Sequence, residues 1–379
     1  MTKNINQNTS LNSVNTPAIM DVDTLKSHRF PRTIALLPTY RCTAACDNCC
    51  FGSHISVEGR IPLERLLQYL DQAKAMGSVS SIVISGGEPF LLGNDLDALV
   101  AHAKFHGFNV RIVTNGYWAI SLHSAKTRLL RLFEAGLDEL NFSTGDYHLK
   151  FIPFERVFWG TKAAIQIGMR VAIAVEHSAN QKFNIDNLLV HHGFREILDN
   201  KELSHQLTIL EVPWIRRGSA IQGDGNRHVE AGPLIKQDPK VLLTRDNLNL
   251  RGACNNVLNS LAITPYERVS ACCGLPSEEI PELDLGSVKE EGLANLYKKG
   301  RVDFIKLWLA IEGPEHILSW AASYDPTIEW EGLYGHQCES CRAIYQNPKV
   351  SAVIREHYTE KLPDVLLRFV ALDKSDFNP

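Results

Sequence analysis

The stretch RCTAACDNC, residues 41–49, places Cys42, Cys46 and Cys49 at the spacing C-x3-C-x2-C. It comes three residues after TIALL, residues 33–37, an apolar run that predicts a strand buried on both faces. Three thiolates on one loop can hold three irons of a [4Fe–4S] cluster and leave the fourth iron open to another ligand. A closed zinc site needs four ligands, so zinc would require one further residue. The spacing favours an iron–sulfur site and leaves zinc as the alternative.

Short apolar runs alternate with stretches of helical period between residues 33 and 213. The runs predict six strands, at 33–37, 81–85, 109–113, 138–142, 170–175 and 206–210. Helices are expected between them at 62–77, 95–106, 124–135, 154–167 and, less regularly, 185–198. Strand–helix alternation of this kind predicts an α/β fold with a parallel sheet and right-handed crossovers.

The unusual stretches of this region all follow strands. They are the cysteine loop, GGEP at 86–89, TNG at 114–116, STGD at 143–146 and Glu176. The carboxyl ends of parallel strands meet at one edge of a sheet, and in α/β barrels this edge carries the chemistry. We therefore expect an active site there.

The three cysteines, followed downstream by Gly86-Gly87-Glu88-Pro89, resemble the signature of the radical S-adenosylmethionine (SAM) superfamily. The resemblance covers roughly residues 30–217 and implies a partial (β/α)6 TIM-like barrel. It implies that Cys42, Cys46 and Cys49 hold a [4Fe–4S] cluster whose open iron binds SAM, and that Gly-Gly-Glu-Pro runs along the methionine part. It also implies reductive cleavage of SAM to a 5′-deoxyadenosyl radical that abstracts a hydrogen atom from the substrate. A flavodoxin- or ferredoxin-type protein is the expected external reductant.

Further residues that contact SAM are expected after the third and fourth strands. They are Thr114, Asn115, Ser143 and Asp146. The resemblance places ribose-binding groups at the end of the fourth strand, which favours Ser143 over Asp146. Thr114 and Asn115 also fit plain turn positions, and Glu88 fits a helix start. His148 is interpreted as a surface or loop residue.

Asn48 departs from the family pattern. Members usually carry an aromatic residue before the third cysteine, where it packs on the adenine of SAM. Phe51 or Tyr40 is expected to supply this apolar surface instead. The departure weakens the expected adenine contact and leaves the cluster assignment unchanged.

A second group of cysteines lies farther along the chain. Its members are Cys254, Cys272, Cys273, Cys338 and Cys341. Residues 260–270, between the first two, predict a hairpin of two short strands. Four thiolates suit an iron–sulfur cluster and zinc equally well. The layout resembles the twitch or shortened SPASM domain that follows many radical SAM barrels, which implies an auxiliary [4Fe–4S] cluster on Cys254, Cys272, Cys338 and Cys341.

This assignment leaves Cys50 and Cys273 over, and the sequence does not decide strongly between Cys272 and Cys273 as the ligand. A buried, inert thiol is the ordinary role of such residues. The alternative is a hydrogen-atom donor to a substrate radical, which peptide epimerases resembling this layout require.

The whole chain has 379 residues, of which 44% are hydrophobic and 22% charged, and a net charge of −4. This balance is that of an ordinary globular protein and points to neither nucleic acid nor a membrane as a partner. The absence of a long apolar run and of a recognisable signal peptide leads us to expect a cytoplasmic protein. Nine cysteines in such a protein indicate metal or redox chemistry.

Five segments are expected along the chain. They are a disordered arm at 1–28, the barrel at 29–220, a linker at 221–245, a small α+β (hairpin plus helix) iron–sulfur domain at 246–346 and a helical tail at 347–379.

The expected activity is modification of a ribosomally made peptide or protein, by crosslinking, thioether formation, oxidation or epimerisation. A small metabolite of cofactor or antibiotic biosynthesis is the alternative substrate. A non-catalytic iron–sulfur or zinc-binding scaffold is the alternative of another class, and Gly-Gly-Glu-Pro at a strand end argues against it.

Overall fold

The structure is a computed structural model that describes residues 31–375, apart from 224 and 226. The arm expected at residues 1–28 lies outside the described residues.

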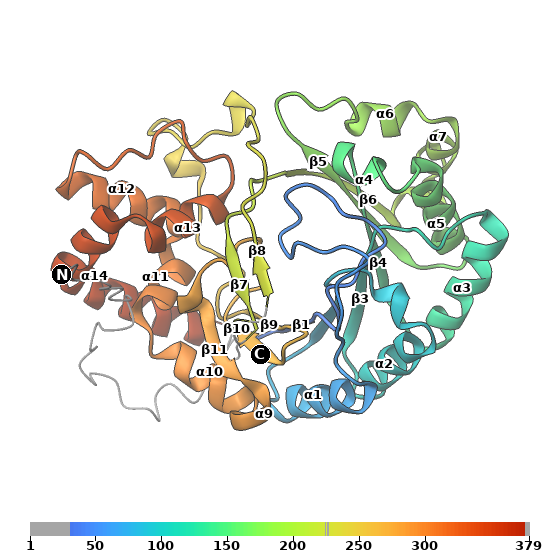
Figure 1. Ribbon diagram of the computed structural model, residues 1–379, viewed down its shortest axis with the longest axis horizontal. Coiled ribbons are helices and arrows are strands. Elements are labelled where there is room, and N and C mark those ends of the chain that lie inside the picture. Colours follow the sequence, from blue (N-terminus) through green and yellow to red (C-terminus); the bar gives the residue numbers. More distant parts are fainter. Residues whose placement is uncertain (1–30, 224, 226, 376–379) are drawn as a thin grey trace, which may run out of the picture.

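Six parallel strands form the barrel part of one continuous sheet (Figure 1). They are β1 (Thr33–Leu36), β2 (Ser81–Ile84), β3 (Asn109–Thr114), β4 (Glu139–Thr144), β5 (Arg170–His177) and β6 (Leu207–Pro213). Neighbours in sequence are neighbours in the sheet, and every pair is parallel. The expected α/β fold with a partial TIM-like barrel is confirmed.

Helices cover the outer, convex face of these strands (Figure 1). The long ones are α1 (Leu63–Ala75), α2 (Asn94–Phe105), α3 (Leu122–Glu134) and α5 (Phe154–Gln166). The short helices of the remaining connections are η3 (Pro89–Leu92), α4 (Asp146–Leu149), α6 (Ile185–Val190), α7 (His192–Asp199) and α8 (Lys201–Ser204). The single helix expected at 185–198 is interrupted at His191, whose extended ψ of 122° ends α6 and begins α7.

The second cysteine region continues the barrel sheet. Its strands are β9 (Ser260–Ile263), β10 (Arg268–Ser270) and β11 (Asp284–Ser287). The antiparallel pairing of β9 with β10 confirms the expected hairpin. In addition, β9 pairs in parallel with β1, which extends the sheet beyond its first strand to nine strands. The hairpin thus shares backbone hydrogen bonds with the strand that precedes the cysteine loop.

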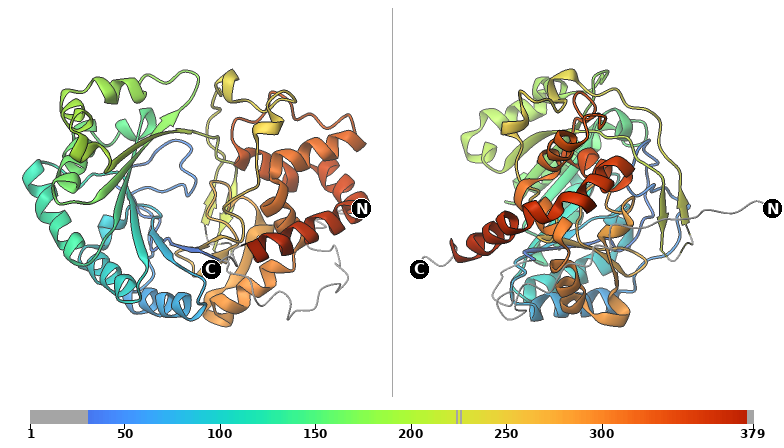
Figure 2. Two further views of the ribbon diagram at one scale, coloured as in Figure 1. Left: turned by 180° about the vertical axis from the view of Figure 1, so that it is seen from behind. Right: turned by 90° about the vertical axis from the view of Figure 1, so that its left-hand side faces the viewer.

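Helices make up most of the rest of the carboxyl-terminal part, on the side of the molecule opposite the barrel helices (Figure 2). They are α9 (Val288–Glu291), α10 (Leu293–Arg301), α11 (Phe304–Glu312), α12 (Pro314–Tyr324), α13 (Gln337–Gln346) and α14 (Pro348–Ser375). They bury Trp308, Leu309 and Ile317 in the core that they share with the barrel. This part is therefore larger and more helical than a hairpin with one helix. Pro363 lies inside α14 and removes one backbone hydrogen bond from it, and the helix continues beyond this residue.

The stretch expected to be a linker contains secondary structure. It holds β8 (Arg227–Val229), which pairs with β7 (Ala220–Gln222) in a second, small sheet, and η4 (Pro239–Val241). The short helix η5 (Leu248–Leu250) follows it. A further short helix, η6 (Pro281–Leu283), precedes β11. Within the described part of the chain, no helix combines the length and apolar character needed to cross a bilayer.

Candidate functional site

The cysteine loop leaves the carboxyl end of β1 and is held by its own backbone. The Cys42 N–H donates to the carbonyl oxygen of His54 at 3.2 Å, and the Cys49 N–H donates to that of Cys46 at 3.1 Å. Cys42 is buried, whereas Cys46 and Cys49 are partly exposed. The loop therefore gathers three cysteines at the carboxyl edge of the sheet, as the spacing predicts.

The two glycines after β2 allow that strand end to lie directly against the cysteine loop. The Gly87 N–H donates to the Thr39 carbonyl oxygen at 2.8 Å, and the Glu88 N–H donates to that of Arg41 at 2.9 Å. A Cβ atom on Gly87 would lie 2.0 Å from the Arg41 carbonyl oxygen. Glycine is therefore required at position 87 by the backbone of the cysteine loop.

Gly87→Ala is expected to lower the free energy of unfolding by at least about 2 kcal/mol, because a backbone atom cannot move aside as a flexible side chain can. Urea unfolding of anaerobically prepared protein measures the change. Gly252→Ala is the matched control, since a Cβ there meets nothing within 4 Å. Equal unfolding midpoints for the two variants would contradict this account of Gly87.

The Glu88 carboxylate is fully buried and joins the ends of β2 and β3. It accepts hydrogen bonds from the Phe90 N–H at 3.1 Å, the Thr114 hydroxyl at 2.8 Å and the Asn115 N–H at 2.8 Å. Burial raises the pKa of Glu88 to about 7, against the lowering effect of these donors. The Thr114 oxygen also accepts from the Trp118 indole N–H at 3.1 Å. Glu88 and Thr114 thus form hydrogen bonds with other groups of the protein.

Asn115 connects this network to the first cysteine. Its Nδ2 lies 3.5 Å from Cys42 Sγ and 3.1 Å from Thr43 Oγ1, and the Ala44 N–H donates to the same sulfur at 3.4 Å. Burial nevertheless raises the pKa of the Cys42 thiol to about 12. A bound metal centre would supply the positive charge that keeps such a buried sulfur ionised. The surroundings of Cys42 therefore fit a metal-bound thiolate better than a free nucleophile.

Asn48 has a structural role that explains its departure from the aromatic pattern. Its φ of 62° lies in the left-handed region, where Asn is favoured. Its buried side chain accepts from the Arg217 N–H at 2.9 Å and donates to the Pro233 carbonyl oxygen at 3.1 Å. The Arg217 guanidinium also donates to the Cys49 carbonyl oxygen at 3.0 Å. Asn48 thus joins the cysteine loop to the chain that follows β6.

The two aromatic residues expected to replace that ring lie together. Tyr40 is buried and stacks on Phe51, with ring centroids 4.9 Å apart, and its hydroxyl donates to Glu278. From β7 and β8, Gln222 and Arg227 donate to the Phe51 carbonyl oxygen at 3.3 and 2.9 Å. Tyr40 and Phe51 therefore anchor the loop to the carboxyl-terminal part of the chain.

The inner, concave face of the sheet is lined by small and polar side chains. Along β4 and β5 the buried residues alternate with partly exposed ones, namely Asn141, Ser143, Ala172 and Ala174. Among the described residues, the buried Asn141 Oδ1 atom has no hydrogen-bond partner. Asp146 instead accepts from the Lys182 and Phe183 N–H groups at 2.7 and 2.9 Å. Ser143 thus shares the concave face with Asn141, and Asp146 secures the loop after β5.

A pair of titratable residues, Glu176 and His148, lies beside the cysteine loop, and the sequence analysis placed only Glu176 at the active edge. Glu176, at the end of β5, accepts from the Tyr147 N–H at 2.7 Å and is hydrogen-bonded to His148 Nδ1. The His148 ring packs edge-on against Trp214, whose indole N–H donates to the Asp47 carbonyl oxygen at 3.0 Å. The interpretation of His148 as a surface or loop residue is wrong, because it lies in α4 and its side chain is only 14% exposed.

Residues 36–187 match the family model described as the radical SAM superfamily. This part of the chain is a radical SAM domain. The family implies a [4Fe–4S] cluster and SAM as cofactors, and the loop that carries Cys42, Cys46 and Cys49 lies within the matched residues.

Two curated proteins are similar to part of this chain. The chain is 24% identical over 123 residues to a "putative peptide biosynthesis protein YydG" of Bacillus subtilis (strain 168), covering 32% of this chain and 39% of that protein. It is 35% identical over 78 residues to an "S-adenosylmethionine-dependent nucleotide dehydratase" of Selenomonas ruminantium, covering 21% and 27%. The chain thus matches about a third of the length of these relatives.

One solved structure shares the fold over most of both chains. It is anSMEcpe with bound AdoMet and Cp18Cys peptide, with a TM-score of 0.51, 14% sequence identity, and coverage of 89% of this chain and 98% of that one. At this identity the likeness concerns the fold alone.

The second cysteine group of this radical SAM protein converges on one pocket. Cys254, Cys272, Cys338 and Cys341 line it. Cys338 lies in the first turn of α13, where the helix dipole favours a thiolate, and Cys341 lies three residues later in the same helix. The Gly274 N–H donates to Cys272 Sγ at 3.0 Å. Burial raises the pKa of each of the four thiols, that of Cys338 to about 12.

The two remaining cysteines lie outside this pocket. Cys273 is exposed, and its sulfur lies 3.8 Å from Asn256 Oδ1. Its surroundings include Ser260, at the start of β9, and Arg111 of β3. The Cys50 thiol donates a hydrogen bond to the Cys49 sulfur, and this bond raises its pKa. Adjacent cysteines at 272 and 273 therefore have different environments.

Proposed function

We propose that this chain is a radical SAM enzyme that cleaves SAM reductively and abstracts a hydrogen atom from a ribosomally made peptide or protein. The observation that carries the proposal is the pairing of two cysteine groups in one fold. Three cysteines gather at the carboxyl edge of the barrel, and four line one pocket of the adjoining part. The product would be a crosslink, a thioether, an oxidised side chain or an epimer.

In this proposal Cys42, Cys46 and Cys49 hold the cluster that binds SAM. When the cluster is reduced and SAM is bound to it, the two cofactors would supply a radical able to abstract a hydrogen atom from an unactivated carbon. Asn115 and the Ala44 N–H support the Cys42 sulfur through the contacts described above. Glu88 acts indirectly, because its oxygens already accept three hydrogen bonds that hold the ends of β2 and β3.

The concave face is the proposed place for the rest of SAM and for the substrate. Asn141 and Ser143 offer polar atoms there, and Ala172 and Ala174 leave space beside them. The Asn141 oxygen, buried and without a partner among the described residues, suits a ligand that donates a hydrogen bond.

The second pocket is proposed to hold an auxiliary [4Fe–4S] cluster and not zinc. A tetrahedral zinc ion with Zn–S bonds of about 2.3 Å would hold its sulfurs about 3.8 Å apart. A cube would hold its thiolates farther apart, because each binds a different iron, and it would use all four cysteines that line the pocket. Such a cluster would accept the electron that the product radical loses when it is oxidised.

Two similar proteins support a peptide substrate. One is described as a peptide biosynthesis protein, and the other was solved with a bound peptide. The nucleotide dehydratase favours a small molecule as the alternative. A flavodoxin- or ferredoxin-type protein is proposed as the reductant, because neither cofactor supplies net electrons.

The test is SAM cleavage by the anaerobically reconstituted, reduced protein. We expect 5′-deoxyadenosine and methionine in the absence of substrate, with faster formation when peptides from the source cells are added. Addition of the small-molecule fraction of the same extract is the matched comparison. Stimulation by that fraction alone would favour a metabolite substrate, and intact SAM under all conditions would favour a non-catalytic scaffold.

A further inference from the structure

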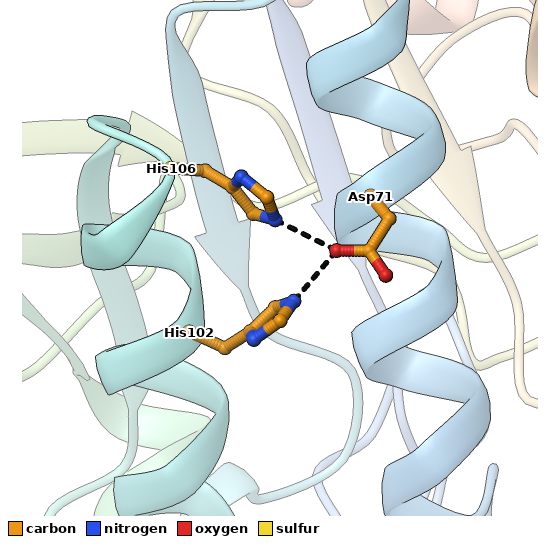
Figure 3. A group of neighbouring side chains, drawn as sticks. All are labelled: Asp71, His102 and His106. Carbon is orange, nitrogen blue, oxygen red and sulfur yellow. Dashed lines mark hydrogen bonds and ion pairs between the residues drawn. The ribbon is translucent and has the colours of Figure 1, made fainter.

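Two histidines and one aspartate converge on the outer surface of the barrel, apart from both cysteine groups (Figure 3). Asp71 belongs to α1, His102 lies in the last turn of α2, and His106 ends that helix. The Nε2 atoms of both histidines lie 2.7 Å from the same Asp71 oxygen, Oδ1. One carboxylate oxygen therefore faces two imidazole nitrogens.

The local sequence explains this arrangement. Residues four apart on a helix lie on the same face, so His102 and His106 both face α1. Their rings meet nearly at right angles, with centroids 4.8 Å apart. Lys74 donates to the His106 carbonyl oxygen at 2.9 Å, which fixes the end of α2 against α1. The three ligand atoms are thus brought together by the packing of two helices.

We propose that Asp71, His102 and His106 form a binding site for a borderline divalent metal ion of the Zn²⁺, Ni²⁺ or Co²⁺ class. Two imidazoles with one carboxylate suit these ions, whereas Mg²⁺ and Ca²⁺ prefer oxygen ligands. The three ligand atoms all lie within 4.8 Å of one another. Around a tetrahedral ion with bonds of about 2.0 Å they would be about 3.3 Å apart, so the side chains need only small adjustments.

The site is accessible to an ion from solution. The side chains of Asp71, His102 and His106 are 55%, 28% and 17% exposed. On binding, the metal displaces the protons that the two Nε2 atoms share with Asp71, and water completes the coordination. In place of two hydrogen bonds, the ion joins α1 to α2 directly.

The position of the site in the fold indicates that the ion would stabilise the barrel and take no part in catalysis. His106 lies just before β3, at the amino-terminal edge of the sheet, whereas the Cys42 loop leaves the carboxyl edge of β1. Residues at the amino-terminal edge of such barrels serve stability, and those at the carboxyl edge serve chemistry. The inference is independent of the proposed reaction with SAM.

The experiment is Zn²⁺ titration of the anaerobically reconstituted protein, in which bound clusters occupy the cysteines, followed by thermal unfolding. We expect one site per chain and a rise in Tm of about 3 °C at 100-fold excess over Kd. Asp71→Asn and His106→Gln should each weaken binding at least about 10-fold and abolish the rise in Tm. Neither residue is among the buried residues of the core, so both variants should fold.

His123→Gln is the matched control, because His123 is an exposed histidine on the neighbouring α3 and lies outside the cluster. It should bind Zn²⁺ as the wild type does. Unchanged binding in Asp71→Asn and His106→Gln would overturn the proposal and indicate that other groups, such as the thiols of Cys50 and Cys273, take the ion. An equal rise in Tm with Mg²⁺ would overturn the assigned class of metal.

Discussion

Replacement of Cys42, Cys46 and Cys49 by alanine is expected to lower the iron content from about 8 to about 4 atoms per chain. SAM cleavage should fall below detection, because the open iron that binds SAM belongs to the cluster held by these residues. Iron analysis of reconstituted protein and assay of 5′-deoxyadenosine measure the two effects. The loss would be specific to one site, since the second cysteine group lies in a separate pocket.

Cys50→Ala is the control for this prediction. Cys50 is next to Cys49 in sequence and its thiol is hydrogen-bonded to the Cys49 sulfur, but it has no assigned place as a ligand. The variant should keep about 8 irons and cleave SAM at a rate near that of the wild type. A triple variant that retained all its iron would contradict the assignment of the first cluster.

Cys272→Ala is expected to remove the iron of the second site, whereas Cys273→Ala is expected to retain it. Cys272 is buried and lines the pocket with Cys254, Cys338 and Cys341, whereas Cys273 is exposed and lies outside it. Loss of Cys272 should lower iron from about 8 to about 4 atoms and leave SAM cleavage without substrate intact. Loss of Cys273 should leave the iron content unchanged.

Metal analysis also separates the alternatives for this pocket. About 4 irons and one zinc in the wild type would contradict the auxiliary cluster and favour a structural zinc site. With a substrate in hand, a Cys273→Ala variant that keeps its iron and cleaves SAM but accumulates no product would favour Cys273 as a hydrogen-atom donor. Full product formation by this variant would exclude that role.

Several features could be predicted because they are local in the sequence. Alternating apolar runs and helical periods predict the six parallel strands, and the strand ends predict that Glu88, Asn115 and Glu176 lie at one edge of the sheet. The predicted hairpin at 260–270 is present as β9 and β10. These predictions succeed because the period of side chains along a strand or helix depends on neighbouring residues alone.

Other features depend on contacts between distant segments. No local pattern indicates that β9 pairs with β1, since a strand of four residues can pair at any free edge. The roles of Asn48 and Tyr40 depend on partners at Arg217, Pro233 and Glu278, all more than 150 residues away. The enclosure of His148 could not be recognised because its neighbours come later in the chain, Glu176 from β5 and Trp214 directly after β6.

The sequence by itself determined the parallel barrel, the cysteine loop at its carboxyl edge and the resemblance to the radical SAM superfamily, which the family match confirms. Only the tertiary structure decided which of Cys272 and Cys273 lines the four-cysteine pocket, and that Asp71 meets His102 and His106. The physical reason is that consecutive side chains leave an irregular loop in different directions. Which of them is buried depends on the surfaces that pack around the loop after the whole chain has folded.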